Sequence, residues 1–127
     1  MGDLTKNISR KEVSCKCGCG QATIDYELLD TFQCACDLAA ERLKRERSVV
    51  IISSANRCIS YNKQIGACSR SWHLSGLAID SYIVELDHIK WFLILKEATK
   101  KRGKEHKFDL KIYSWGVHFE RDLRKSM

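Results

Sequence analysis

Apolar positions along the chain follow a helical spacing in two stretches, which are the two main helices expected. Residues 24–46 repeat apolar side chains along one helix face and end in a run of basic residues. The same spacing returns at residues 85–102, and Gly103 suits the end of that helix. For the second helix, the expected buried face comprises Leu86, Ile89, Phe92, Leu93 and Ala98.

Shorter apolar runs and strict polar–apolar alternation predict the strands. Residues 48–55 and 77–83 are short, apolar and partly β-branched, as buried strands are. Residues 107–113 and 117–123 alternate, as half-exposed strands do. Residues 56–72 are expected to be a loop. We therefore predict an α+β fold with a small antiparallel sheet and two main helices.

Length and composition favour a single domain over residues 1–127, because a chain of 127 residues supports one modest core. Residues 1–23 are expected to form an irregular, cysteine-rich arm. No apolar run is long enough to cross a membrane, and the first residues lack the pattern of a signal peptide. These features predict a cytoplasmic protein unless another device exports it.

A histidine and an aspartate stand close together at the start of the second predicted strand. His73 lies on the loop that leads into it, and Asp80 lies on the strand itself. Gly76 between them lets the backbone turn sharply, so the two side chains can converge. Because a neutral imidazole and a carboxylate are both good zinc ligands, this pair is a candidate metal site.

A third ligand is expected from the last predicted strand. His118 and Glu120 are two positions apart there, so they point to the same face, which we expect to be the face that carries Asp80. The predicted zinc ligands are therefore His73, Asp80 and His118. Three protein ligands leave one position open for water, as in catalytic zinc sites.

The net charge of +6 lies mostly in the last quarter of the chain. A basic region favours anionic partners such as nucleic acid, lipid or a charged cell wall, although solvated helix ends give the same pattern and are the more common cause. The sequence contains no recognition-helix or base-stacking motif, so nucleic-acid binding ranks last among the functions considered.

The seven cysteines are an odd number without a signal peptide, which favours reduced thiols or metal ligands over a disulfide framework. Cys15, Cys17 and Cys19 alternate in the arm without a Cys-x-x-Cys pair or a nearby histidine. Small buried residues in a tight loop are therefore favoured there over a structural zinc. A disulfide between Cys58 and Cys68 is a further, weaker option.

Several of these residues together resemble a known family. The pattern resembles the zinc D-alanyl-D-alanine peptidases, which include VanY-like carboxypeptidases and small phage endolysins and share a metal site with lysostaphin and the hedgehog signalling domain. The matching positions are Ser53, Ser54, Arg57, Asn62, Gly66, Ser71, His73, Gly76, Ala78, Asp80, His118 and the opening segment 15–20.

The resemblance implies a zinc metallopeptidase with one zinc ion that hydrolyses a peptide bond of the peptidoglycan stem peptide. The D-Ala-D-Ala carboxypeptidase and L-Ala-D-Glu endopeptidase reactions both fit. Arg57 and Ser71 would bind the substrate. Many relatives carry the catalytic acid three residues before the last histidine, where this chain has Trp115; small phage-type members carry it two residues after, which implies Glu120 as the base.

Asp122, further along the same alternation, and the more remote Asp109 are the fallback bases. The resemblance also implies a monomeric phage or prophage lysin, held in the cytoplasm until a pore-forming partner releases it to the cell wall. The alternative is a catalytically inactive binding or structural module on the same fold. The departure from the usual pattern around His118 motivates that alternative.

Overall fold

The computed structural model describes residues 3–126, which contain a four-stranded antiparallel sheet. The strand order is β1-β2-β4-β3, so the two strands that carry candidate ligands are neighbours at the centre. The bounds are β1 Val50–Ser54, β2 Ala78–Ile83, β3 Phe108–Tyr113 and β4 Gly116–Arg121. The predicted strands are thus confirmed, with ends shifted by a few residues, and so is the α+β class.

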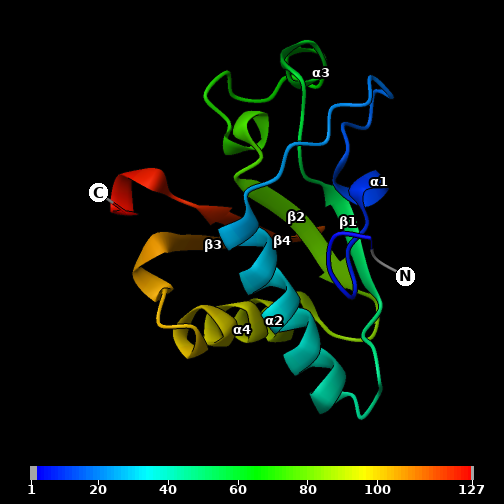
Figure 1. Cartoon of the computed structure of the whole chain (residues 1–127), viewed down its shortest axis with the longest axis vertical. Coiled ribbons are helices and arrows are strands. Elements are labelled where there is room, and N and C mark those ends of the chain that lie inside the picture. Colours follow the sequence, from blue (N-terminus) through cyan, green and yellow to red (C-terminus); the bar gives the residue numbers. More distant parts are fainter. Residues whose placement is uncertain (1–2, 127) are drawn as a thin grey trace.

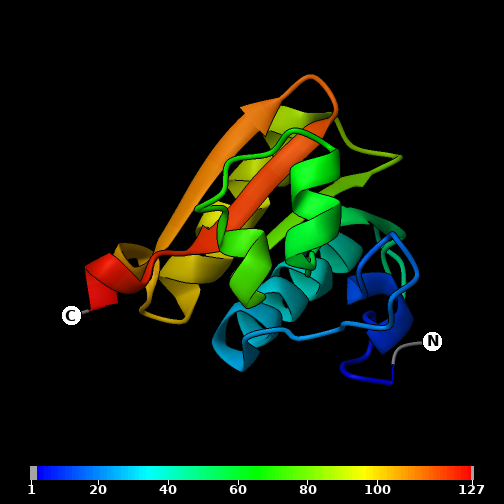
Figure 2. The same cartoon turned by 90° about the horizontal axis from the view of Figure 1, so that it is seen from above.

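Two helices lie along one face of the sheet, α2 (Tyr26–Arg42) and α4 (His88–Lys101) (Figure 1). The remaining helical segments are short: α1 Arg10–Val13, α3 Ile59–Gln64, and the 3-10 turns Trp72–Ser75, Glu105–Lys107 and Leu123–Ser126. Seen from above, α3 and the first 3-10 turn lie over the sheet on the side away from α2 and α4 (Figure 2). The sheet therefore has one face for the core and one for the candidate site.

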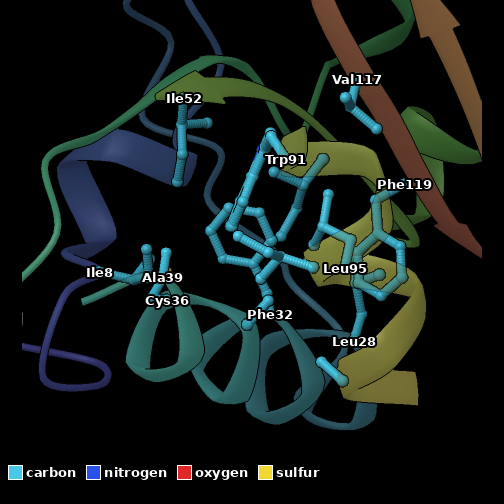
Figure 3. Close-up of a cluster of buried hydrophobic side chains, with 14 of the residues drawn as sticks. Ile8, Leu28, Phe32, Cys36, Ala39, Ile52, Trp91, Leu95, Val117 and Phe119 are labelled. Atoms are coloured by element: carbon cyan, nitrogen blue, oxygen red, sulfur yellow. The ribbon is translucent and has the colours of Figure 1, made fainter. Parts of the chain in front are cut away.

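The core lies between this sheet and the two long helices (Figure 3). Phe32 of α2 meets Trp91 of α4 edge-on, with ring centroids 5.8 Å apart, and Phe119 of β4 stacks on Phe108 at 5.0 Å. The indole N–H of Trp91 donates to the Ser81 hydroxyl at 3.0 Å, so the largest buried side chain has its polar atom satisfied.

The predicted buried face of the second helix is wrong for two of its five members; Ala98 is buried, and Leu86 and Phe92 are partly buried against the core. Ile89 and Leu93 are exposed, whereas Trp91, Ile94, Leu95 and Ala98 are buried. Both sets repeat at helical spacing, so periodicity alone could not choose between them. Packing decides between them, because Trp91 meets Phe32 of α2 and donates its indole N–H to Ser81 of β2.

The segment 56–72 is not a plain loop, because it contains α3. Cys58 caps this helix, its sulfur accepting the backbone N–H of Tyr61. The N-terminal arm is also more ordered than expected: α1 begins with a Ser9–Glu12 capping box, and Ile8 and Val13 are buried in the core. Within residues 3–126, no helix has both the length and the apolar composition to cross a bilayer.

Candidate metal centre

Strand pairing sets two of the candidate ligands side by side. Asp80 of β2 is directly opposite His118 of β4, and Ala78 is opposite Glu120. Side chains alternate across a sheet, so Asp80, His118 and Glu120 share the face opposite Ile79 and Phe119, which point into the core. The predicted common face is therefore observed.

His73 reaches the same place from the 3-10 turn Trp72–Ser75. The turn ends at Gly76, whose φ of 71° is in the left-handed region and redirects the chain into β2. A Cβ at this position would lie 2.8 Å from the carbonyl carbon of Thr23. Only glycine fits both the dihedral angle and the space. The sharp turn predicted at Gly76, between His73 and Asp80, is therefore present.

The three predicted ligands converge. One donor atom from each of His73, Asp80 and His118 lies within 4.8 Å of the other two. The Asp80 carboxylate stands between the rings, 3.1 Å from Nε2 of His73 and 2.6 Å from Nδ1 of His118. His73 and Asp80 are buried and His118 is half-buried, so water around the three groups is limited.

The backbone fixes the tautomer of His73. Its Nδ1 is 2.6 Å from the carbonyl oxygen of Ala55, which can only accept, so Nδ1 carries the proton. Nε2 is then the nitrogen that faces Asp80, at 3.1 Å, and the one available to a metal ion. A histidine ligand whose other nitrogen donates to a carbonyl is the usual arrangement at metal sites.

His118 lies between two carboxylates, with Nε2 2.7 Å from Glu120 in addition to the Asp80 contact. Burial disfavours charge on both partners, but their mutual hydrogen bonds outweigh it. The pKa of Asp80 falls to about 2, and that of His118 rises to about 9. The pair is therefore an ionised carboxylate beside a protonated ring, and a metal ion must displace that proton to bind His118.

Arg57 lies beside these ligands. Its Nη2 is 3.5 Å from Asp80, while Nε and Nη1 donate to Ser54 (3.0 Å) and Asn62 (3.2 Å). Each terminal nitrogen carries a second N–H, so the guanidinium retains donors for a further carboxylate. Ser54 and Asn62, noted in sequence only as spacing matches, thus hold this arginine in place.

The other predicted residues are placed as follows. The hydroxyl of Ser71 accepts the backbone N–H of His73 at 3.2 Å, so it caps the ligand-bearing turn. The carboxylate of Asp122 accepts hydrogen bonds from the backbone and guanidinium of Arg124. Neither Asp122 nor Asp109 lines the cleft described next, whereas Glu120 does.

A cleft of roughly 400 Å³ opens over the ligands. Its walls include Arg57, Trp72, Tyr113, Trp115 and, in addition, the cations Arg70 and Lys111. Tyr113 and Trp115 stack at 5.0 Å, forming an exposed aromatic surface at the β3–β4 turn. Cations and aromatic surfaces in a cleft suit a ligand that carries carboxylates.

Sequence reasoning missed Asn56 among the supporting residues. Its buried amide donates to the His73 carbonyl at 3.0 Å and accepts the N–H of Thr23 at 2.9 Å. It missed Lys111 and Tyr113 as cleft residues too. Their positions on the predicted strand 107–113 alternate with the core-facing ones, and that alternation was the available signal.

These donors fit zinc. Two imidazoles and one carboxylate form a common three-residue zinc set, the free nitrogen of His73 is correctly oriented, and the Asp80 carboxylate is ionised. Harder cations such as calcium and magnesium prefer an all-oxygen set, which these three residues do not supply.

A family model described as peptidase M15 matches residues 6–112. The match includes Arg57, His73 and Asp80 and ends before His118. No curated protein matches the chain, and no solved structure matches it. Because the family match covers most of the sequence, the chain belongs to the peptidase M15 family, which comprises zinc-dependent metallopeptidases that act on peptidoglycan.

Proposed function

We propose that this protein hydrolyses a peptide bond of the peptidoglycan stem peptide with one zinc ion held by His73, Asp80 and His118. The observation that carries the proposal is the convergence of these three donors within 4.8 Å, beneath a cleft, in a chain of the M15 family. Zinc bound there would polarise the carbonyl of the scissile amide and acidify a water molecule.

Arg57 is the proposed substrate-binding residue. Its guanidinium is positioned by Ser54 and Asn62 and retains N–H donors on the cleft side. A planar guanidinium binds a carboxylate through two parallel hydrogen bonds, which suits the terminal carboxylate of a D-Ala-D-Ala peptide or the D-Glu carboxylate of an endopeptidase substrate. Ser71 is proposed to support the same end of the substrate from the rim of the cleft.

Glu120 is the proposed general base, because it and Asp80 are the carboxylates that line the cleft, and Asp80 is a proposed ligand. Its contact with Nε2 of His118 also suits a second role, that of orienting a ligand histidine. The two roles of Glu120 affect different measurable quantities. A base contributes to the rate at saturating zinc, whereas an orienting carboxylate contributes to zinc affinity.

The test is mass spectrometry of muropeptides after incubation of the zinc-loaded protein with whole sacculi. Loss of a terminal D-Ala identifies a carboxypeptidase, and cleavage between L-Ala and D-Glu identifies an endopeptidase. Glu120→Gln should retain zinc and lose at least about a hundredfold in rate if Glu120 is the base. Glu41→Gln, on the exposed end of α2, is the matched control and should retain full activity.

A different result supports the orienting role. Glu120→Gln would then bind zinc about 10–100-fold more weakly, and added zinc would restore the rate. Intact sacculi of several wall types after incubation with protein that holds its zinc would reject hydrolysis. That outcome would favour the inactive binding module, for which the Glu120–His118 contact is the structural argument.

We further propose a phage or prophage-type lysin that reaches the wall through a pore made by a partner; this rests on the sequence resemblance. Expression in bacteria together with a pore-forming protein should then lyse the cells, and expression alone should not. Lysis that is equally fast without the pore-forming protein would reject this route.

A further inference from the structure

Four cysteines from two distant parts of the chain meet at a point where Cys58 directly follows Arg57. Three lie on the loop that follows α1, and the fourth caps α3; this cysteine cluster consists of Cys15, Cys17, Cys19 and Cys58. All four sulfurs lie within 4.8 Å of one another. The cluster shares no residue with the His73, Asp80 and His118 site, and hydrolysis as proposed above does not use it.

The sulfur–sulfur distances match a single tetrahedral ion. Cys15 is 3.4 Å from Cys17, and Cys58 is 3.7 Å from each of them. Zinc–sulfur bonds are about 2.3 Å long, so the corners of a tetrahedral thiolate site are about 3.8 Å apart. A multi-iron cluster needs a wider cage, and a disulfide would use only two of the four sulfurs.

The backbone is shaped to point alternate cysteines at one place. Gly18 and Gly20, between and after the cysteines, have φ values of +85° and +89°, so the loop curls rather than extends. The N–H of Cys15 donates to the Gln21 carbonyl at 2.7 Å and closes the loop. In an extended strand, the side chains of Cys15, Cys17 and Cys19 would lie in a row and could not meet at one point.

Backbone N–H groups also face the sulfurs. The N–H of Cys58 lies 3.4 Å from the sulfur of Cys15, and the N–H of Tyr61 lies 3.3 Å from that of Cys58. Such N–H donors stabilise thiolate ligands and hold them in position. Cys17 and Cys19 are exposed, which contradicts the expectation of small buried residues and leaves these two sulfurs accessible to a metal ion.

We propose that the cysteine cluster binds a second zinc ion in a closed structural site. The ion would join segments 43 residues apart and so constrain the unfolded chain. It would also fix Arg57, which directly precedes Cys58 and whose carbonyl accepts the side-chain amide of Gln21 at 3.1 Å. The structural zinc thus supports the wall of the cleft without contacting substrate.

Cobalt(II) titration of the reduced full-length protein, after a chelator has removed its metal, tests this proposal. Thiolate ligands give cobalt an intense ultraviolet charge-transfer band that histidine and aspartate do not. We expect this band to saturate at one equivalent and to disappear on zinc addition. The double variant Cys17→Ser/Cys19→Ser should lose it, whereas His73→Ala and the control Cys34→Ser, on α2 outside the cluster, should keep it.

Zinc content distinguishes this site from the proposed catalytic one. The wild type should hold two zinc ions per chain, and either Cys17→Ser/Cys19→Ser or His73→Ala should hold one. If the wild type holds one ion and the thiolate band persists, the cysteine site stands and the catalytic site fails. Absence of the thiolate band from reduced wild type, or its survival in the double cysteine variant, would overturn the cysteine site.

Discussion

At the scale of single residues, His118 has the most unusual environment at the site. Two carboxylates contact its ring, and they raise its pKa to about 9 in spite of partial burial. Below that pH the ring is protonated, so zinc must displace a proton in order to bind. Proton competition, rather than a lack of donors, is therefore expected to limit zinc affinity near neutral pH.

We predict that the zinc affinity of the catalytic site rises about tenfold per pH unit between about pH 6 and pH 9, and levels off above that. Chelator competition measured on Cys17→Ser/Cys19→Ser isolates this site from the cysteine cluster. Glu120→Gln removes one negative charge beside His118, so its curve should level off at a lower pH. An affinity that is independent of pH over this range would contradict the assignment of His118 as a ligand.

At the scale of elements, the turn before β2 determines whether His73 meets Asp80. Gly76→Ala should cost at least about 2 kcal/mol of unfolding free energy and lower zinc affinity, because the methyl group meets the Thr23 backbone and the left-handed angle is strained. Urea unfolding and zinc titration measure the two effects.

Gly66→Ala is the matched control for that turn. Its φ is 73°, close to that of Gly76, but a Cβ there meets nothing within 4 Å. It should cost only the strain of the left-handed angle, about 1–2 kcal/mol, and leave zinc binding unchanged. Equal losses in the two variants would show that the contact with Thr23 does not matter.

The rotation of α4 is a second element-scale feature with a matched pair of residues. Leu95 is fully buried, whereas Leu93, two positions earlier, is 54% exposed. Leu95→Ala should destabilise the protein by about 2–5 kcal/mol through cavity formation, and Leu93→Ala should stay within about 0.5 kcal/mol. Thermal or urea denaturation compares them directly, and the reverse order would mean that the helix presents its other face to the core.

At the scale of the whole molecule, charge is distributed unevenly. The net charge is +6, most of it in the last quarter of the chain, where Lys96 and Lys100 are exposed on α4. Peptidoglycan is the polymer on which the family acts, and bacterial walls carry anionic groups. A long-range attraction between the basic region and the wall is therefore expected to be screened by salt.

We predict that sedimentation of the protein with isolated walls decreases steadily as salt is raised from about 0.05 M to about 0.5 M. Lys96→Glu/Lys100→Glu should reduce binding at low salt more than the same reversal at Lys11 and Lys63, which lie on α1 and α3. If the two double variants bind equally, net charge alone, and not the basic quarter, governs adsorption.

The sequence alone determined the class of elements, the order of strands along the chain and the face that His118 shares with Glu120. Local signals suffice for these, because period-two alternation fixes that shared face, and a glycine permits the turn before Asp80. The pairing of β2 with β4, which sets His118 opposite Asp80, is a tertiary contact. The same local signals failed for Ile89 and Leu93 of α4, where two apolar stripes had equal periodicity and only packing against Phe32 and the sheet chose between them.

Tertiary structure alone decided the contacts between residues far apart in sequence. The three alternating cysteines of the arm have no fourth sulfur nearby in sequence, and the fold places Cys58 beside them. The carbonyl of Ala55 set the tautomer of His73, and Ser54 and Asn62 fixed Arg57. Such contacts depend on how segments far apart in sequence pack together in three dimensions. The periodicity of residues along the chain carries no information about that packing.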